Sequence, residues 1–193
     1  MQNIWEGCIM DIYFLSSNKF KINEVRSILT SSHITVYPVS QKINEIQSMD
    51  MEEIVSDKCL KAFKQIGRPI LVEQTGLLIK DFGGLPGGLT QIFWDSLEAD
   101  KFSEIFSKIG SAEVTAKTVL AFCNGKVVKT FEGTIEGHIV SPPRGNRAFQ
   151  WDCIFEPVGY AETFAELGDK KNDISMRKIA LEKLRRYLEG AYD

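Results

Sequence analysis

The sequence predicts a mixed α/β fold, in which a long central sheet is flanked by helices. Helical and extended patterns alternate in the first part of the chain, and antiparallel extended patterns dominate later. The 193 residues, 44% hydrophobic and 25% charged, are typical of one globular domain with a substantial core. No repeat, low-complexity segment or linker divides them, so we expect a single domain over residues 1–193.

The chain begins with a strand–helix–strand pattern. Residues 11–16 read as a strand, and Ser17-Asn18 forms the N-cap of a helix over 19–29, whose apolar residues fall on one stripe. Residues 34–38 predict a second short strand. Polar residues at the junction of the first strand and its helix are therefore expected near the end of the sheet.

A second helix and a buried strand follow. Asp50 and Glu53 make a D-x-x-E capping box that opens a helix through Ile66, stopped by Gly67. The apolar run 70–73 is interpreted as a buried strand that ends in a polar turn.

The later part of the chain predicts a hairpin and a terminal helix. A Gly/Pro turn at 83–88 leads into residues 89–94, and an amphipathic helix that includes Phe102, Ile105, Phe106 and Ile109 follows. Asn124-Gly125 is the strongest short hairpin signal, and Ser175 caps a final helix. The extended segments are expected at 114–123, 126–131 and 134–140, with a rigid turn at 141–145.

Composition excludes several classes of protein. The net charge of −3 argues against a duplex nucleic-acid binder, which normally carries a basic excess. No apolar run is long enough to cross a bilayer, and the N-terminus lacks the basic region of a secretory signal. The four cysteines (Cys8, Cys59, Cys123 and Cys153) have no metal-binding or redox spacing. We therefore expect a cytoplasmic protein with unpaired thiols.

The first candidate site is the junction 16–21. Ser16 and Asn18 lie where a strand enters a helix, so free backbone N–H groups point above the helix start, and Lys19 and Lys21 add positive charge. An anion site fits this pattern. On this motif alone an ordinary N-cap with solvated lysines is favoured, because polar turns between a strand and a helix are common.

Carboxylates supply the second candidate. Glu45 lies between two isoleucines, and Glu73 ends a buried strand, where α/β folds place their ligands. Together they predict an Mg²⁺ site completed by the phosphates of a substrate. Glu45 alone also reads as a loop glutamate. Gln74, next to Glu73, is an amide where a site that activates water needs a second acid.

The third candidate is the stretch 143–177. Phe149 and Trp151 are suited to stacking on a nucleobase, Asp152 to accepting from ring N–H groups, and Arg177 to donating to ring oxygens. The alternative is that the aromatic residues belong to the core.

In order along the chain, these stretches resemble the inosine triphosphate pyrophosphatase (ITPase) family of non-canonical purine triphosphate pyrophosphatases. The resemblance covers residues 11 to about 188. It is carried by SSNKFKINEV, INEIQ, LVEQTGL, GGLPGG, FEGTIEGHIV, PPRG, FQWDCIF, TFAEL and KKNDISMR.

The resemblance implies a two-lobed fold with a nucleotide groove between the lobes, usually in a homodimer. It implies Mg²⁺-dependent hydrolysis of inosine, deoxyinosine or xanthosine triphosphate to monophosphate and pyrophosphate. The implied metal ligands are Glu45 and Glu73. The implied substrate contacts are Ser16, Asn18, Lys21, Lys58, Phe149, Trp151, Asp152, Lys171, Ser175 and Arg177.

The chain departs from the family pattern at Gln74, Met176 and Gln150, where the family has aspartate, histidine and glycine. Gln74 replaces the expected general base, and an amide cannot accept a proton near neutral pH. Losing a general base typically costs about 10²–10⁴ in rate. Glu73, on a strand, should point away from the face that Gln74 occupies.

The sequence therefore favours a purine triphosphate-binding pocket with impaired hydrolysis, suited to a sensor. By analogy, ITPase-like subunits of some anti-phage systems signal deoxyinosine triphosphate to an NAD-consuming effector, and this chain would suit such a role. An active pyrophosphatase using Glu73 or Glu45 as base is the main alternative. A dimer module without ligand is the third.

Overall fold

The computed structural model describes residues 10–31 and 33–190 of the chain. Cys8 and the N-terminal stretch used to argue against a secretory signal lie outside the described residues. The other three cysteines are free and buried, as expected. Within the described part, no helix is both long enough and apolar enough to span a membrane.

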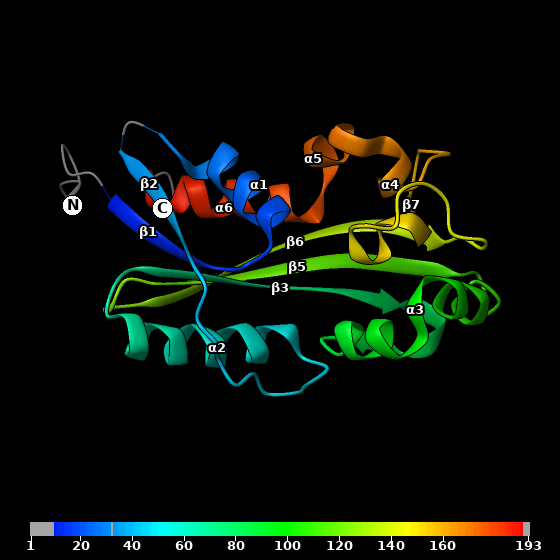
Figure 1. Ribbon diagram of the computed structural model, residues 1–193, viewed down its shortest axis with the longest axis horizontal. Coiled ribbons are helices and arrows are strands. Elements are labelled where there is room, and N and C mark those ends of the chain that lie inside the picture. The colour runs from blue at the N-terminus through cyan, green and yellow to red at the C-terminus, as the bar shows by residue number, and fades with distance from the viewer. Residues whose placement is uncertain (1–9, 32, 191–193) are drawn as a thin grey trace.

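A mixed seven-stranded sheet forms the middle of the molecule, as predicted, with the order β2-β1-β3-β5-β6-β7 and β4 paired with β3 (Figure 1). β1 pairs in parallel with both β2 and β3, whereas β3, β5 and β6 are antiparallel neighbours. The strands are β1 (Met10–Leu15), β2 (Ile34–Val39), β3 (Ile70–Ile79), β4 (Pro86–Gly87), β5 (Glu113–Cys123), β6 (Val128–Ile139) and β7 (Phe155–Pro157).

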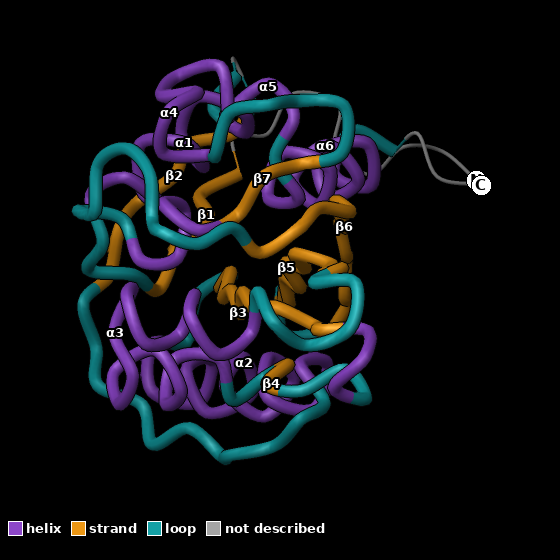
Figure 2. The backbone as a smooth tube through the Cα atoms, turned by 90° about the vertical axis from the view of Figure 1, so that its right-hand side faces the viewer, coloured by secondary structure: helices purple, strands orange, loops and turns teal. Residues whose placement is uncertain are grey.

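Helices cover both faces of this sheet (Figure 2). Two helices, α2 and α3, lie on one face, and the other four lie on the opposite face, where α1 packs against α6. Their bounds are α1 (Lys19–Leu29), α2 (Met51–Ile66), α3 (Thr90–Phe106), α4 (Phe164–Leu167), α5 (Lys171–Ile174) and α6 (Met176–Leu188). Three short 3₁₀ turns complete the elements: η1 (Lys80–Phe82), η2 (Gln150–Ile154) and η3 (Gly168–Lys170).

The predicted helix starts are confirmed because capping is local chemistry. The side chain of Asn18 accepts from the backbone of α1, that of Asp50 from Glu52 and Glu53, and that of Ser175 from Lys178. Gly67 ends α2 in the left-handed conformation, as its position predicts.

Strand β3 is longer than predicted. The expected strand 70–73 continues through the polar residues Gln74 and Thr75 to Ile79, because all ten residues pair with β5. Gly76 sits beside β4 so closely that an added Cβ would lie 2.3 Å from the carbonyl oxygen of Gly87. Gln74 therefore lies within a strand and not in a turn.

The second half of the sheet also differs in detail from the prediction. The expected strands 126–131 and 134–140 form one strand, β6, and α3 already begins at Thr90. Helix α3 bends at Glu98, where φ is 56° and ψ is 178°.

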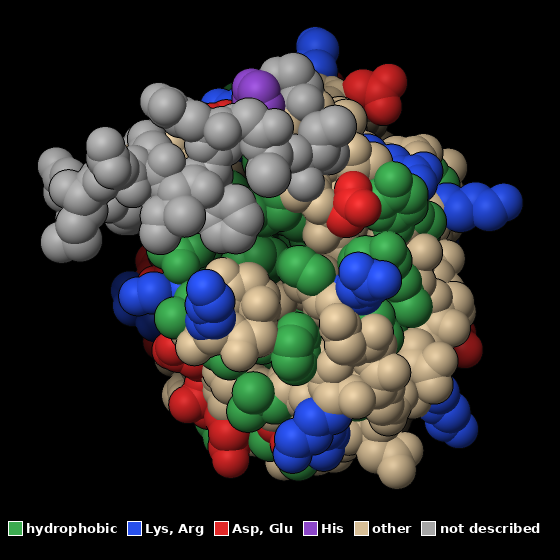
Figure 3. Space-filling model, turned by 90° about the vertical axis from the view of Figure 1, so that its left-hand side faces the viewer, with side chains coloured by type: hydrophobic (Ala, Val, Ile, Leu, Met, Phe, Trp, Pro, Cys, Tyr) green, Lys and Arg blue, Asp and Glu red, His purple; other side chains and the backbone are tan. Residues whose placement is uncertain are grey.

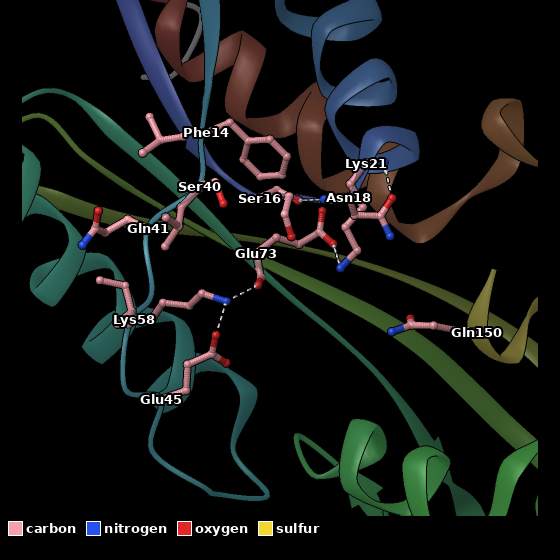
Figure 4. A pocket seen from close by; sticks show the side chains of 14 residues that line it. Phe14, Ser16, Asn18, Lys21, Ser40, Gln41, Glu45, Lys58, Glu73 and Gln150 are labelled. Atoms are coloured by element: carbon pink, nitrogen blue, oxygen red, sulfur yellow. Dashed lines mark hydrogen bonds and ion pairs between the residues drawn. The ribbon is translucent and has the colours of Figure 1, made fainter. Parts of the chain in front are cut away.

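The end of the molecule that carries the turn between β5 and β6 is mixed in character. Figure 3 shows hydrophobic side chains in its middle, separate basic groups around them and several acidic groups near one another at the lower left, in the part that the grey atoms leave uncovered. The charged cavities lie instead beside the ends of β1 and β2 (Figure 4).

Candidate functional site

The site forms where the parallel strands β1 and β2 end. β1 ends at Leu15 and β2 at Val39, while β3 continues past them, so Glu73 and Gln74 face the loops that leave the two ending strands. This is the edge where α/β sheets place ligands.

The first cavity, which we call the Lys21 cavity, has a volume of about 310 Å³. The side chain of Asn18 accepts from the backbone N–H groups of Phe20 and Lys21, at 2.9 and 3.3 Å. Ser16 accepts from the backbone N–H of Asn18. The structure thus brings Ser16, Asn18 and Lys21 together, as expected. The cavity is also lined by Glu45, Lys58, Glu73 and Gln150.

Glu73 is buried in a network of cations. Arg177 donates to both of its oxygens, at 2.7 and 3.0 Å, and Lys21 lies 2.9 Å from one of them (Figure 4 shows the Lys21 contact). Burial alone would raise the pKa of Glu73, but the charges and hydrogen bonds of Arg177 and Lys21 outweigh it and hold the pKa well below its usual range. The expectation that Glu73 binds metal or serves as base is therefore not favoured, because its carboxylate is already neutralised.

Gln74 lies on the opposite face of β3, as the strand periodicity predicts. Its amide nitrogen donates to the carbonyl oxygen of Gly88, at 3.1 Å. It lines a second cavity of about 280 Å³, the Gln74 cavity. The two cavities share Lys21, Glu45, Lys58, Glu73 and Gln150, so they are neighbouring parts of one groove.

Glu45 is the carboxylate left for a metal. It pairs with Lys58 at 2.7 Å and keeps 36% of its side-chain surface exposed. Among the described residues no group of three or more His, Cys, Asp or Glu side chains could hold a metal. The donors present fit an ion held by Glu45, by the amide oxygen of Gln74 and mainly by phosphate oxygens, which is a mode that Mg²⁺ uses.

A larger cavity of about 580 Å³, the Phe149 cavity, lies on the other side of the first turns of α1. Its lining includes Phe20, Glu24, Phe149, Asp152, Lys171 and Arg177. Phe20 meets Phe149 edge to face, with ring centroids 5.7 Å apart. The Lys171 nitrogen lies 4.1 Å from the Phe149 ring centroid, so one face of this ring already holds a cation.

Asp152 and Lys171 form a buried pair at this cavity. The Lys171 nitrogen lies 2.5 Å from one Asp152 oxygen, and the other oxygen, Oδ1, has no hydrogen-bond partner among the described residues. Burial raises the pKa of Asp152 and lowers that of Lys171, while each charge opposes this effect on its partner. A buried acceptor without a partner at a cavity is suited to a ligand that donates a hydrogen bond.

Three of the expected contacts are buried. Trp151 is 3% exposed and packs in the core against Phe155, and it is not among the residues that line the Phe149 cavity. Ser175 is fully buried and donates to Glu24. Arg177 is 1% exposed, and its donors are engaged by Glu24 and Glu73.

The departures at Met176 and Gln150 also have structural outcomes. Met176 is buried in the core and offers no donor to the groove. Gln150 has a φ of 42°, in the left-handed region that glycine adopts most readily, and its side chain lines both smaller cavities.

Sequence reasoning missed Glu24. It is 8% exposed and pairs with Arg177 at 2.6 Å, although 153 positions separate the two residues. On the helix 19–29 it follows Lys19, Lys21 and Asn23, which suggest a solvated face. No signal in a single sequence indicates this pairing, because the two residues meet only through the packing of α1 against α6.

The sequence of this chain is similar to proteins of a known family. The model of the Ham1 family matches residues 12–187. This chain belongs to the Ham1 family. The family assignment confirms the resemblance found in the sequence and covers all three cavities.

Several named relatives align with this chain over nearly its whole length. Inosine triphosphate pyrophosphatase from Yarrowia lipolytica is 38% identical, over 93% of this chain and 96% of its own. The protein of the same name from Schizosaccharomyces pombe is 34% identical, over 94% and 97%. The dITP/XTP pyrophosphatase from Hyperthermus butylicus is 31% identical, over 92% and 94%.

Solved structures confirm the Ham1 fold. A HAM1 protein from Coxiella burnetii superposes with a TM-score of 0.83 at 26% identity, over 94% of this chain and all of its own. The Staphylococcus aureus Ham1 protein gives 0.78 at 23% identity, with the same coverage, and supports the fold alone.

Proposed function

We propose that this chain binds a non-canonical purine nucleoside triphosphate, such as dITP or ITP, and hydrolyses it poorly. The relatives at 31–38% identity carry names that state hydrolysis of such nucleotides. The groove has polar and aromatic groups suited to binding such a nucleotide. Of the two positions suited to activating water, one is an amide, Gln74, and the other, Glu73, is already paired with cations.

The observation that carries this proposal is the pair Glu73–Gln74. The amide of Gln74 has no basic state near neutral pH, and it already donates to Gly88. The carboxylate of Glu73 is held by Arg177 and Lys21 with a depressed pKa, so it is a poor proton acceptor. Neither residue of the pair can take a proton from an attacking water with ordinary efficiency.

Binding is supported by the division of the groove. The Lys21 cavity offers Asn18, Lys21 and Lys58 to phosphates, close to the start of a helix whose N–H groups favour anions. The Phe149 cavity offers the free Oδ1 of Asp152 to a base edge that carries an N–H group, as hypoxanthine and xanthine do. Because Trp151 is buried in the core, Phe149 is the predicted aromatic residue that remains available to stack on the base.

A pocket that holds its ligand without rapid turnover can report the ligand's concentration. We infer that this chain acts as such a sensor subunit, as a homodimer in the cytoplasm, with an effector protein as partner. By analogy, the effector is an NAD-consuming enzyme of an anti-phage system. The selective loss of the base, with the binding groups kept, is the feature that supports this inference.

The second candidate is an active pyrophosphatase with Glu45 as base. One observation favours it: Glu45 lines both the Lys21 and Gln74 cavities, remains partly exposed and has Lys58 as its ion-pair partner. In the first candidate Mg²⁺ would neutralise phosphate charge when bound, held by Glu45 and the amide oxygen of Gln74; in the second, Glu45 is reserved as base and the ion would be held by Gln74 and the phosphate oxygens. The protein side chains Lys21 and Lys58 would position the phosphate chain.

The deciding experiment separates binding from turnover. The purified chain is titrated with a non-hydrolysable α,β-imido analogue of ITP, and pyrophosphate release from dITP and ITP with Mg²⁺ is followed separately. We expect clear binding and a rate about 10²–10⁴ below that of an ordinary family enzyme. Fast release that Glu45→Gln abolishes supports the second candidate, and no binding refutes both.

A further inference from the structure

Gln150 reaches into the groove from the layer opposite to α3. It opens η2, and its side chain lines both the Lys21 and the Gln74 cavities, which makes it part of the passage between them (Figure 4). Its φ of 42° is uncommon for a residue with a side chain and costs free energy of folding. A strained residue that points into a cleft is a candidate for function.

Two polar residues of α3 fix the orientation of this amide. Gln91 donates from its amide nitrogen to Asp95 at 2.6 Å and accepts from the amide nitrogen of Gln150. A carboxylate only accepts, so Asp95 determines which end of the Gln91 amide faces it. Gln91 must therefore present its oxygen to Gln150, and Gln150 must present its NH₂ group to Gln91.

The same segment is attached to α3 by an ion pair. Arg147 donates to both oxygens of Asp100, at 2.7 and 3.0 Å. Segment 147–150 is thereby held across the groove at two points, so the Gln150 amide has a defined place and not only a defined orientation.

The orientation leaves one N–H of Gln150 without an assigned acceptor. An amide nitrogen carries two hydrogens, and Gln91 takes one. The two nearby lysines each carry an ion pair, Lys21 with Glu73 and Lys58 with Glu45. A neutral donor in the passage can bind an anionic oxygen without separating either ion pair, and hydrogen bonds to charged groups are the stronger class.

We propose that Gln150 donates a hydrogen bond to the phosphate chain of the ligand, and that Asp95 acts as a positioning residue for it through Gln91. This rests on the proposed function only in placing phosphates in the Lys21 and Gln74 cavities. It adds a ligand contact that the resemblance did not supply, because Gln150 stands at one of the positions where the chain departs from the family pattern.

The test uses inorganic tripolyphosphate, which carries the phosphate chain without the base, titrated calorimetrically into the full chain. Gln150→Gly removes the donor at a position where glycine is conformationally favoured, so folding is preserved. We expect about a tenfold loss of affinity, with a melting temperature equal to or above that of the wild type. Gln150→Glu, which adds a like charge, should lose more.

The positioning role of Asp95 is tested by a double-mutant cycle. Asp95 is exposed and is not one of the residues lining the three cavities, so a purely structural role predicts no change in binding. We expect Asp95→Asn to lose about two- to tenfold in tripolyphosphate affinity. It should lose nothing further when added to Gln91→Ala. Glu104→Gln is the control, because it removes an exposed acid from the same helix, where it pairs with Lys108, and Glu104 lines none of the three cavities.

Failure of this proposal and of the proposed function are distinguishable. Equal tripolyphosphate affinity for the wild type and Gln150→Gly overturns the proposal, as does a wild type that binds no tripolyphosphate. If the Gln150 variants lose tripolyphosphate affinity but the ITP analogue binds no better than tripolyphosphate, the donor role stands and base recognition fails. Additive losses in the cycle overturn the role of Asp95.

Discussion

The two walls of the groove differ in how their charges are held. On one wall, Glu24 and Lys21 of α1, Arg177 of α6 and Glu73 of β3 make a buried network, in which each carboxylate has a cationic partner. On the wall formed by α2, α3 and the loop before α2, Glu45 and Lys58 make a single, partly exposed pair, and Gln74 is neutral. Under the proposed function, the first wall is preorganised for holding a ligand, whereas the second has an amide where a base would activate water.

The two walls differ in what a substitution costs in folding. A buried network is costly unless each member is paired, and removing one member exposes that cost. An amide at position 74 costs little in folding, because it donates a hydrogen bond to Gly88. An amide at this position is therefore compatible with an intact network on the opposite wall.

The largest expected effect comes from adding an acid to the second wall. Gln74→Asp should raise the rate of pyrophosphate release from dITP by about 10²–10⁴, because it supplies a proton acceptor in the Gln74 cavity. The carboxylate would face the Gly88 carbonyl in place of donating to it, which also favours a raised pKa and a better base. Pyrophosphate release under single-turnover conditions measures the effect.

Gln74→Asn is the matched control for that substitution, because it has the size of aspartate without its charge. Its rate should stay at the wild-type level. If Gln74→Asp is no faster than Gln74→Asn, the missing base does not limit this chain, and the contrast between the two walls loses its chemical meaning.

The next effect tests the first wall. Arg177→Met leaves Glu24 and Glu73 buried without their main partner and should lower the free energy of unfolding by about 3–5 kcal/mol. Arg147→Met breaks an exposed pair with Asp100 and should cost less than about 1 kcal/mol. Urea unfolding compares the two. Equal losses in the free energy of unfolding would mean that the buried Arg177 network contributes no more to stability than the exposed pair.

Whether an element could be predicted from the sequence depends on how far apart in the chain the residues that determine it lie. The helix starts at Asn18, Asp50 and Ser175 were predicted because a cap acts within three residues. The length of β3 was not, because Gln74 and Thr75 are strand residues only through pairing with β5, some 45 positions away in the chain. Propensity alone does not encode such a partner.

The site shows the same division. Asn18 and Lys21 lie in one local motif and lie together in the structure, as predicted. Trp151 was read as a stacking residue because it neighbours Phe149 and Asp152, yet it points into the core. In an irregular segment such as 149–152, the direction of each side chain depends on the backbone φ and ψ, which the residue types do not fix.

Phe149 and Trp151 allow a direct test of that correction. Phe149→Ala should weaken binding of the ITP analogue by about 1–3 kcal/mol with little change in stability, since stacking on a base has that magnitude. Trp151→Phe should lower the free energy of unfolding and leave the affinity nearly unchanged, because Trp151 contacts core residues. Titration and thermal unfolding of both variants give the two quantities, and the reverse pattern would restore Trp151 as the stacking residue.

The smallest effect concerns acid. Because the folded-state pKa of Glu73 lies below its unfolded value, the stability it contributes is complete above about pH 4.3 and is lost as the pH falls toward the folded pKa. Within that window the unfolded chain binds one proton more at this position, so Glu73 steepens the fall by up to about 1.4 kcal/mol per pH unit. Glu73→Gln should remove this part of the slope, although it also lowers stability at pH 7.

The control is Glu132→Gln. The hydrogen bond from Lys117 also lowers the pKa of Glu132, but that side chain is 56% exposed, so solvent screening makes its share of the slope smaller. Urea unfolding between pH 3 and pH 5 compares the wild type with both variants. A slope that Glu73→Gln leaves unchanged would mean that the carboxylate is not held ionised by Arg177 and Lys21. In that case Glu73 would again be available as a base, and the wall that we describe as preorganised for binding would also be the one that cuts.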